Sequence, residues 1–282
     1  MIKGLTRAGI GEAGPICNFV ELASRFGFGA VDAHGQELEE WIATAGLEQV
    51  RGFLQEKQVR IGAIGLAAEW RQTEDAFREG LPRLAAEAAA ASKLGVTACC
   101  TYVLPSTNEN AARFMAAATR RLRLCADILE AYGIRLGLEF VGPHHLRTRW
   151  KHPFLWDAES MLEWIDTIGK SSVGLLFDAY HWYTTGGTAA DIAKLRADQI
   201  VHVHINDAKD VPVAEVLDND RVYPGEGVID LTTFLQGLQR IGYTGVVAQE
   251  ILTPQPPADT AEALAARSQQ AFKRVYEKAG LA

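Results

Sequence analysis

The chain has 282 residues, of which 48% are hydrophobic and 22% are charged, and its formal net charge is −7. This composition is that of a globular protein, and the negative charge disfavours binding to nucleic acid or to anionic lipid. The first residues, MIKGLTRAGIGEAGP, lack the apolar core of a signal peptide, and no uncharged apolar run reaches the ~18 residues that span a bilayer. We therefore expect a cytoplasmic protein that binds neither nucleic acid nor membranes.

Short apolar runs alternate along the chain with longer segments of helical period, which is the pattern of strand–helix units on a parallel sheet. The predicted strands cover residues 3–10, 30–33, 60–66, 96–103, 135–141, 173–178, 200–207 and 245–251. The predicted helices cover residues 16–26, 38–57, 73–94, 109–132, 158–168, 189–196, 231–241 and 258–279. Eight such pairs predict an α/β fold, a single (β/α)8 TIM barrel domain over residues 1–282. A doubly wound open sheet is the alternative, but no GxGxxG follows the first predicted strand.

Polar residues stand at or near the carboxyl ends of four consecutive predicted strands, as Glu139, Asp178, His204 and Glu250. Each alone has a structural explanation, and Asp178 in LLFDAYHWYTTGG is placed either to cap the next helix or to serve a site. In a barrel these strand ends converge, and three carboxylates in one pocket need a counter-charge. One divalent metal ion supplies it, with Mn²⁺ as the first choice and Mg²⁺, Co²⁺ or Zn²⁺ as alternatives.

A Lewis acid beside Glu139 and Glu250 suits the removal of a proton next to a carbonyl, because the ion stabilises the resulting enediolate. One glutamate takes the proton, and the same or the facing glutamate returns it. Return to the adjacent carbon gives isomerisation, and return from the other face of the original carbon gives epimerisation. His202 shares a strand face with His204, and we expect it in a lower layer of the barrel or behind the metal ligands.

Other candidate binding residues lie in loops. Trp182 offers an apolar wall for the C–H face of a ring. Arg221, in the long loop after the seventh predicted strand, is able to bind substrate oxygens or orient a glutamate, and a surface ion pair with a neighbouring aspartate is the alternative. His145 lies in HHLRTRWKH, residues 144–152, which either binds an anionic substrate or forms a solvated lid.

The segments LGLEFVGPHH, LLFDAYHWYTTGG, VHVHINDAKD, DNDRVYPGEGVIDL and VVAQEIL together resemble the xylose-isomerase-like TIM-barrel superfamily of sugar isomerases and epimerases. Within it they are most similar to the inosose (2-keto-myo-inositol) isomerases, convincingly over residues 60–252. The resemblance implies that Glu139, Asp178, His204 and Glu250 bind one divalent metal and that the two glutamates are the acid/base pair. It also implies that His181 and Arg221 contact the substrate.

The sequence thus predicts a metal-dependent isomerase or epimerase of a small keto-sugar or inosose-like keto-polyol. A dehydratase or a C-glycoside-cleaving lyase on the same metal site is the alternative. An apurinic-site endonuclease would need further ligands on the early strands, where only His34 and Glu69 are available. A non-catalytic sugar-binding barrel would not need both glutamates beside a metal. Because dimers and tetramers are common in the superfamily, the resemblance also allows a homo-oligomer.

Overall fold

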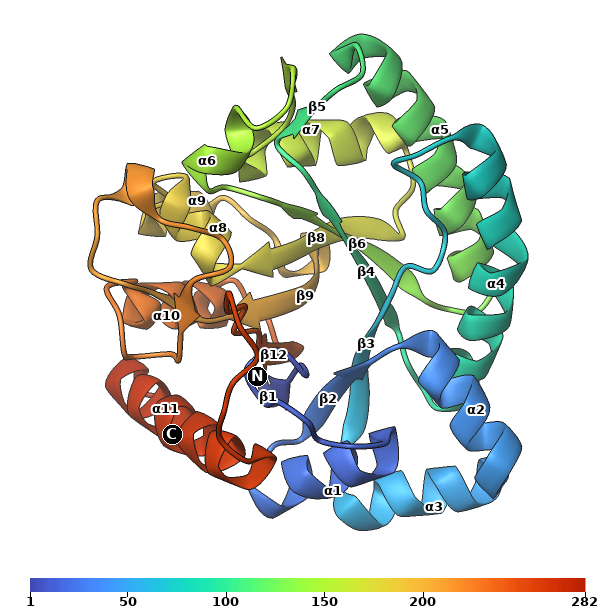
Figure 1. The fold of residues 1–282 in the computed structure, drawn as a ribbon, viewed down its shortest axis with the longest axis vertical. Coiled ribbons are helices and arrows are strands. Elements are labelled where there is room, and N and C mark those ends of the chain that lie inside the picture. The colour runs from blue at the N-terminus through green and yellow to red at the C-terminus, as the bar shows by residue number, and fades with distance from the viewer. Residues whose placement is uncertain (282) are drawn as a thin grey trace.

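The computed structural model, which describes residues 1–281, is a closed barrel of parallel strands inside a ring of helices (Figure 1). Each barrel strand pairs with the next along the chain, and the last pairs with the first, so the sheet has no open edge. The predicted (β/α)8 TIM barrel is confirmed. Its strands are β1 (Ile2–Leu5), β2 (Ala30–Ala33), β3 (Arg60–Gly65), β4 (Ala98–Val103), β6 (Arg135–Phe140), β8 (Val173–Asp178), β9 (Ile200–Ile205) and β12 (Val246–Gln249).

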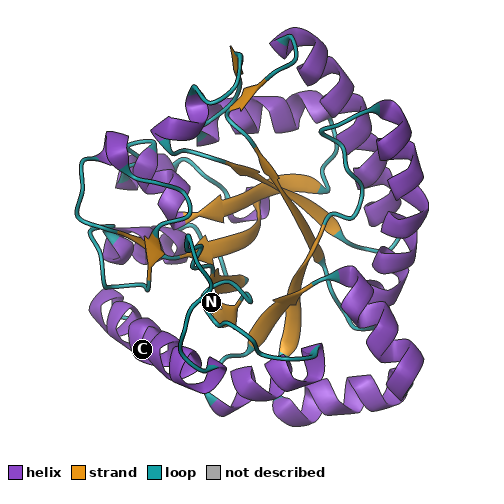
Figure 2. Cartoon of the chain, viewed as in Figure 1, coloured by secondary structure: helices purple, strands orange, loops and turns teal. Residues whose placement is uncertain are grey.

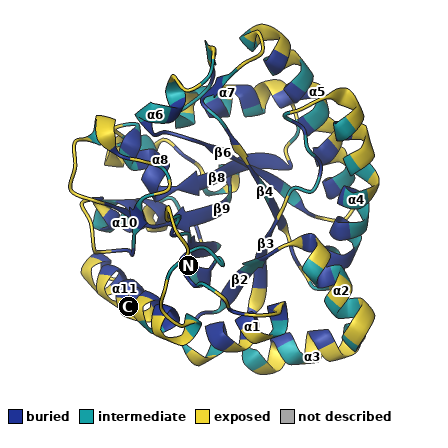
Figure 3. Cartoon of the chain, viewed as in Figure 1, coloured by how far each residue is buried: buried dark blue, intermediate teal, exposed yellow. Residues whose placement is uncertain are grey.

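The outer ring consists of amphipathic helices that cover the barrel strands (Figure 2). In α5, for example, Leu122 and Leu129 are buried one heptad apart while Arg120 and Arg123 are exposed, so one stripe of the helix packs inward. The strands are buried and the outward helix faces are exposed (Figure 3). The helices are α1 (Ile16–Arg25), α2 (Gly35–Ala45), α3 (Leu47–Lys57), α4 (Glu74–Lys93), α5 (Ala111–Glu130), α7 (Ala158–Ile168), α9 (Ala189–Ala193), α10 (Leu231–Arg240) and α11 (Ala261–Ala279).

Within residues 1–281 no helix combines the length and the apolar character needed to cross a bilayer. Short elements fill the loops at the carboxyl ends of the strands. They are helices α6 (His144–Arg147) and α8 (Ala179–Thr184), the paired strands β5 (Ser106–Thr107) and β7 (His152–Pro153), the paired strands β10 (Asp207–Ala208) and β11 (Arg221–Val222), and the 3-10 turn Val213–Glu215. Another 3-10 turn, Ala197–Gln199, leads into the amino end of β9.

Several predicted elements differ from the structure; the strand predicted over residues 200–207, for example, ends at Ile205, and Asp207 belongs to the separate strand β10. The helix predicted over residues 38–57 is two helices, α2 and α3, because the chain bends at Gly46, whose φ of 87° only glycine adopts readily. The strand predicted over residues 3–10 ends at Leu5, since the barrel pairs β1 with β2 only at Gly4 and Leu5 and the following residues leave the sheet.

The loop between β9 and α10 folds back over the mouth of the barrel. Its anchor is the Asp207 carboxylate, which accepts hydrogen bonds of 2.8–3.0 Å from four backbone N–H groups, those of Ala208, Gly225, Gly227 and Ile229. The strand β11 pairs antiparallel with β10 and brings Arg221 opposite Ala208. Asp207 therefore fixes the loop that carries Arg221.

This packing makes Gly227 hard to replace. A Cβ added there would overlap the carbonyl oxygen of Ala208 and approach Asp207 Oδ1 to 2.6 Å, so we expect Gly227→Ala to destabilise the protein by about 1–3 kcal/mol in urea unfolding. Gly52→Ala in α3 is the control, because a Cβ there meets no atom and alanine should stabilise the helix by roughly 0.5–1 kcal/mol. Equal stabilities for the two variants would contradict the role assigned to this turn.

Candidate active site

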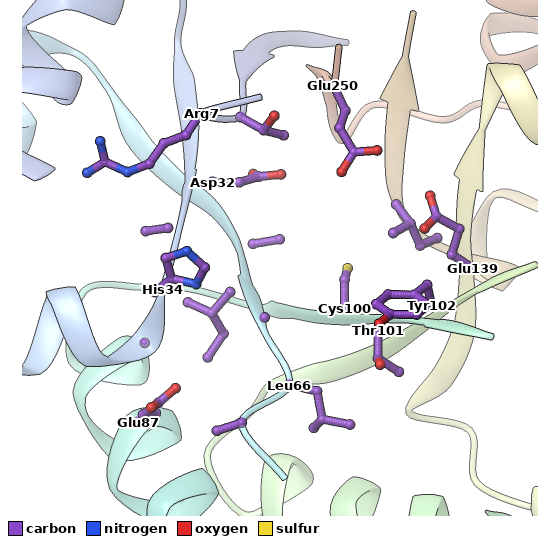
Figure 4. A pocket seen from close by; sticks show the side chains of 18 of the residues that line it. Arg7, Asp32, His34, Leu66, Glu87, Cys100, Thr101, Tyr102, Glu139 and Glu250 are labelled. Carbon is purple, nitrogen blue, oxygen red and sulfur yellow. The ribbon is translucent and has the colours of Figure 1, made fainter. Parts of the chain in front are cut away.

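Four polar side chains predicted from the strand ends meet at the carboxyl end of the barrel. Glu139 is on β6, Asp178 ends β8, His204 is on β9, and Glu250 follows β12. One ligand atom from each lies within 4.8 Å of the others. His204 Nδ1 is 3.6 Å from Glu139 Oε1, 3.5 Å from Glu250 Oε2 and 3.9 Å from Asp178 Oδ2. Figure 4 shows Glu139 and Glu250 directed into one cavity.

Strand register explains why these side chains converge. Asp178 and His204 are directly paired neighbours on β8 and β9, so their side chains leave the sheet on the same face. Glu139 is paired in the same way with Tyr102 of β4. The closed sheet therefore sets the spacing between these side chains, and the loops do not.

The ionisable groups of this cluster strongly perturb one another. Burial raises the pKa of Glu139. Burial alone would also raise the pKa of Glu250, but His204 and Arg221 outweigh it and hold that pKa well below its usual range. Burial alone would lower the pKa of His204, but the charge of Glu250 and the nearby carboxylates of Asp32 and Glu139 raise it well above its usual value. Such mutual perturbation of pKa values is typical of functional sites.

The residues present fit a divalent metal ion. Glu139 Oε1 and His204 Nδ1 are buried, and neither has a hydrogen-bond partner within residues 1–281, which is costly unless another group binds them. The spacing of 3.5–3.9 Å from His204 Nδ1 to three carboxylate oxygens is close to the roughly 3.4 Å expected between tetrahedral ligands at about 2.0–2.2 Å from an ion. Three carboxylates and one imidazole are ligands that Mn²⁺ and Zn²⁺ accept.

The cluster opens into a cavity of about 780 Å³. Three arginines line the cavity wall, and each is paired with a carboxylate: Arg7 with Glu37 at 2.6 Å, Arg71 with Glu69 at 3.2 Å, and Arg83 with Glu87 at 2.6 Å. With these charges balanced, the wall offers hydrogen bonds without a free cation, which favours a neutral ligand rich in hydroxyl groups.

Arg221 and His181 lie behind the metal ligands. Arg221 is buried, and its Nη1 donates to Asp178 Oδ2 at 3.0 Å and to Glu250 Oε2 at 2.8 Å. It also donates to Asp218 at 2.9 Å, so the expected orientation of a glutamate and the expected ion pair occur together. His181 Nδ1 accepts from the backbone N–H of Gly142 at 3.2 Å. Its Nε2 lies 3.9 Å from Glu139 Oε1.

None of the four predicted binding residues is among those that line the cavity: His181 and Arg221 lie behind the candidate metal ligands, and Trp182 and His145 lie elsewhere. We expected Trp182 to form an apolar wall, but it is buried in the core with its indole 5.5 Å from the ring of Phe234. It turns inward because α8 packs against the barrel beside α10. His145 lies half-buried in α6, outside the set of residues that line the cavity.

Three functional candidates were missed from the sequence. Asp32 on β2 and Tyr102 on β4 line the cavity, and Tyr102 is 46% exposed there. Asn206 donates from Nδ2 to both oxygens of Asp178, at 3.1 and 3.0 Å. The strand-end criterion that selected Glu139 also applies to Asp32 in the predicted strand 30–33. Asn206 stands two positions after His204 on the chain. The pairing of His204 with Asp178 brings Asn206 close to the Asp178 carboxylate.

Comparison with known proteins gives concordant results. A family model described as xylose isomerase-like TIM barrel matches residues 20–274. An inosose isomerase from Bacillus velezensis is 32% identical over 155 residues, which are 54% of this chain and 52% of that protein, so the chain spans about half the length of such curated relatives.

Solved structures extend the likeness over the whole chain. A xylose isomerase domain protein from Alicyclobacillus acidocaldarius is 32% identical with a TM-score of 0.90 and covers 99% of both chains. A structure described as IOLI protein with a bound zinc atom is 24% identical with a TM-score of 0.81, covering 99% of this chain and 98% of that one.

The raised pKa of His204 predicts a pH-dependent stability of the metal-free protein. Because this pKa is higher in the folded than in the unfolded state, its contribution is complete below about pH 6.5 and is lost as pH rises through the folded pKa. The Tm of metal-free protein should therefore fall above pH 6.5. The rise in Tm on adding Mn²⁺ should grow over the same range, since the ion must replace the Nδ1 proton.

Thermal unfolding from pH 6 to 9, with and without Mn²⁺, measures both effects. His204→Gln should lose both, whereas the control His152→Gln, on β7 in the two-stranded β5–β7 sheet, should keep them. A His204→Gln protein with the pH dependence of the wild type would contradict the assignment.

Proposed function

Because the chain belongs to the xylose isomerase-like TIM barrel family, we propose that it is a divalent-metal-dependent isomerase or epimerase of an inosose-like keto-polyol. The observation that carries this proposal is the pair of glutamates, Glu139 and Glu250, that enter one cavity from β6 and the end of β12 beside a cluster fitted to a metal. The similarity to inosose isomerases supports the substrate class.

Glu139, Asp178, His204 and Glu250 would hold the ion. A divalent ion bound there supplies Lewis acidity to a carbonyl oxygen and its neighbouring hydroxyl. Mn²⁺ remains our first choice, and the zinc of the solved relative makes Zn²⁺ the main alternative.

The two glutamates move the proton. One carboxylate removes a proton from the carbon next to the carbonyl, and the resulting enediolate receives a proton from the same or the facing glutamate. Arg221 holds Glu250 by a hydrogen bond of 2.8 Å and Asp178 by one of 3.0 Å, which restricts the orientation of both carboxylates. We propose that Arg221 and His181, at the back of the site, orient the substrate and the metal-binding side chains.

Tyr102, and not Trp182, would provide the apolar wall for a substrate ring. It lines the cavity, is the direct strand neighbour of Glu139, and is 46% exposed (Figure 4). The guanidinium of Arg71 lies 4.2 Å from the centre of its ring and donates to the Tyr102 carbonyl at 3.1 Å, which holds the residue in place. A ring held in this way provides an apolar surface for the C–H face of a cyclic polyol.

Solvent exchange tests the proposed reaction. Manganese-loaded protein is incubated in D₂O with 2-keto-myo-inositol and a panel of ketohexoses, and deuterium incorporation is followed by NMR. Exchange at a carbon next to the carbonyl is expected, and the product shows whether the carbonyl migrates or a centre inverts. Release of water from the substrate instead would indicate a dehydratase, and no reaction with any substrate would reject the proposal.

Glu250→Gln should lower the rate of deuterium exchange by roughly 10²–10⁴-fold, because the amide cannot accept the proton. Ligand binding, measured by calorimetry with the metal present at saturating concentration, should be retained. Glu163→Gln on α7, an exposed glutamate, is the matched control and should exchange at the wild-type rate. Full activity of Glu250→Gln with metal bound would remove Glu250 from the acid/base pair.

Tyr102→Ala should raise KM by roughly fivefold, since an aromatic contact contributes on the order of 1 kcal/mol. Tyr102→Phe keeps the ring and should leave KM within about twofold of the wild type. The two variants separate the ring from the hydroxyl in initial-rate measurements. A larger loss in Tyr102→Phe than expected would assign the contact to the hydroxyl group.

A further inference from the structure

A second group of ionisable side chains lies directly beneath the candidate metal ligands. Asp32 of β2 accepts a hydrogen bond at Oδ2 from His202 Nε2 of β9, at 2.8 Å. The same oxygen lies 3.5 Å from Nε2 of His204. The side chains of Asp32 and His202 are 15% and 2% exposed, so the group is largely shielded from water. The proposed proton transfer uses neither residue.

The His204 ring presents its two nitrogens to different partners. Nδ1 faces the carboxylates of Glu139 and Glu250, at 3.6 and 3.5 Å, whereas Nε2 faces Asp32. An imidazole binds a metal through the nitrogen that carries no proton, and its remaining proton must then be on the other nitrogen. For His204 to bind an ion through Nδ1, it must carry that proton on Nε2, next to Asp32.

The barrel keeps Asp32 in this place. Its hydrogen bond with His202 joins two positions that are 170 residues apart in the chain. On the neighbouring strand β3, a Cβ at Gly62 would approach Asp32 Oδ1 to 2.6 Å, so glycine leaves the space that the carboxylate fills. The pairing of β2 with β3 is irregular between Val31 and Ala33, where Asp32 lies.

We propose that Asp32, held by His202, is a positioning residue that keeps the His204 ring oriented with Nδ1 toward the metal and the Nε2 proton toward Asp32. This inference rests on the metal site of the proposed function. A carboxylate behind a metal-binding histidine fixes the tautomer and the ring orientation, and its loss typically lowers metal affinity by roughly 10–100-fold.

Asp32, His202 and His204 also have the spacing of a second metal site. The 2.8 Å hydrogen bond between Asp32 Oδ2 and His202 Nε2 favours the positioning role, because these two atoms already bind each other without an ion. Metal content separates the two interpretations: positioning predicts one ion per chain, and a second site predicts two.

The experiment is a double-mutant cycle on metal affinity. Dissociation constants for Mn²⁺ and Zn²⁺ are measured by competition with a chelator for the wild type, Asp32→Asn, His204→Gln and the double variant. We expect Asp32→Asn to weaken binding by roughly 10–100-fold in the wild-type background. In the His204→Gln background, the same change should alter affinity by less than about twofold, because the ring on which Asp32 acts is gone.

Thermal unfolding without metal confirms that each variant is folded. If Asp32→Asn does not fold, His202→Gln replaces it, since loss of this hydrogen bond frees Asp32 and should also weaken metal binding only when His204 is present. Three results would overturn the inference. They are wild-type metal affinity in the folded Asp32→Asn variant, an equal loss of affinity in the wild-type and His204→Gln backgrounds, and two bound ions per chain. The cycle uses no sugar substrate, so a failure of the deuterium exchange leaves its outcome unaffected.

Discussion

The architecture of the site follows from one constraint, which is the placement of three carboxylates close together in a largely buried position. Glu139, Asp178 and Glu250 come from neighbouring parts of the closed sheet, and Arg221, His204 and His181 are the basic side chains within 4 Å of them in residues 1–281. Asp218 shares the guanidinium of Arg221, and Asp32 lies 3.5 Å from His204, so carboxylates outnumber the basic groups around the cluster. This excess of negative charge favours a bound cation, and it also explains why a buried arginine is part of the site.

That arginine links the site to the loop over the barrel mouth. Arg221 is on β11, and β11 is positioned by its pairing with β10 and by the four backbone hydrogen bonds to Asp207. The strand ends alone would leave the carboxylates short of positive charge. The loop after β9 thus completes a site whose ligands the barrel provides, which is why a long loop is retained there.

The sequence predicts the role of a residue best when that role depends only on the position of the residue in its own strand. Glu139, Asp178, His204 and Glu250 were identified because apolar runs mark buried strands and barrel topology brings their ends together. The strand-end pattern also covers Asp32 on β2, but the contact that gives Asp32 its proposed role is with His202, 170 residues away, and no local pattern indicates that contact.

Side-chain direction limited the prediction in the same way. Trp182 and Tyr102 are both aromatic residues near strand ends, but the helical turn of α8 directs Trp182 into the core while the strand β4 directs Tyr102 into the cavity. The break at Gly46 was likewise hidden, since the helical period continues across it. Periodicity gives the elements, but packing between elements decides which way a side chain at an element boundary points.

Asp178 shows that a helix cap and a functional site need not be alternatives. Its Oδ1 accepts from the backbone N–H of Tyr180 and so begins α8, while its Oδ2 accepts from Arg221 and lies 3.9 Å from His204 Nδ1. Asn206 donates to both oxygens and fixes the plane of the carboxylate. One oxygen thus sets the start of the helix that carries His181, and the other faces the candidate metal ligands. The motif DAYH therefore couples the two roles through the two oxygens of one aspartate.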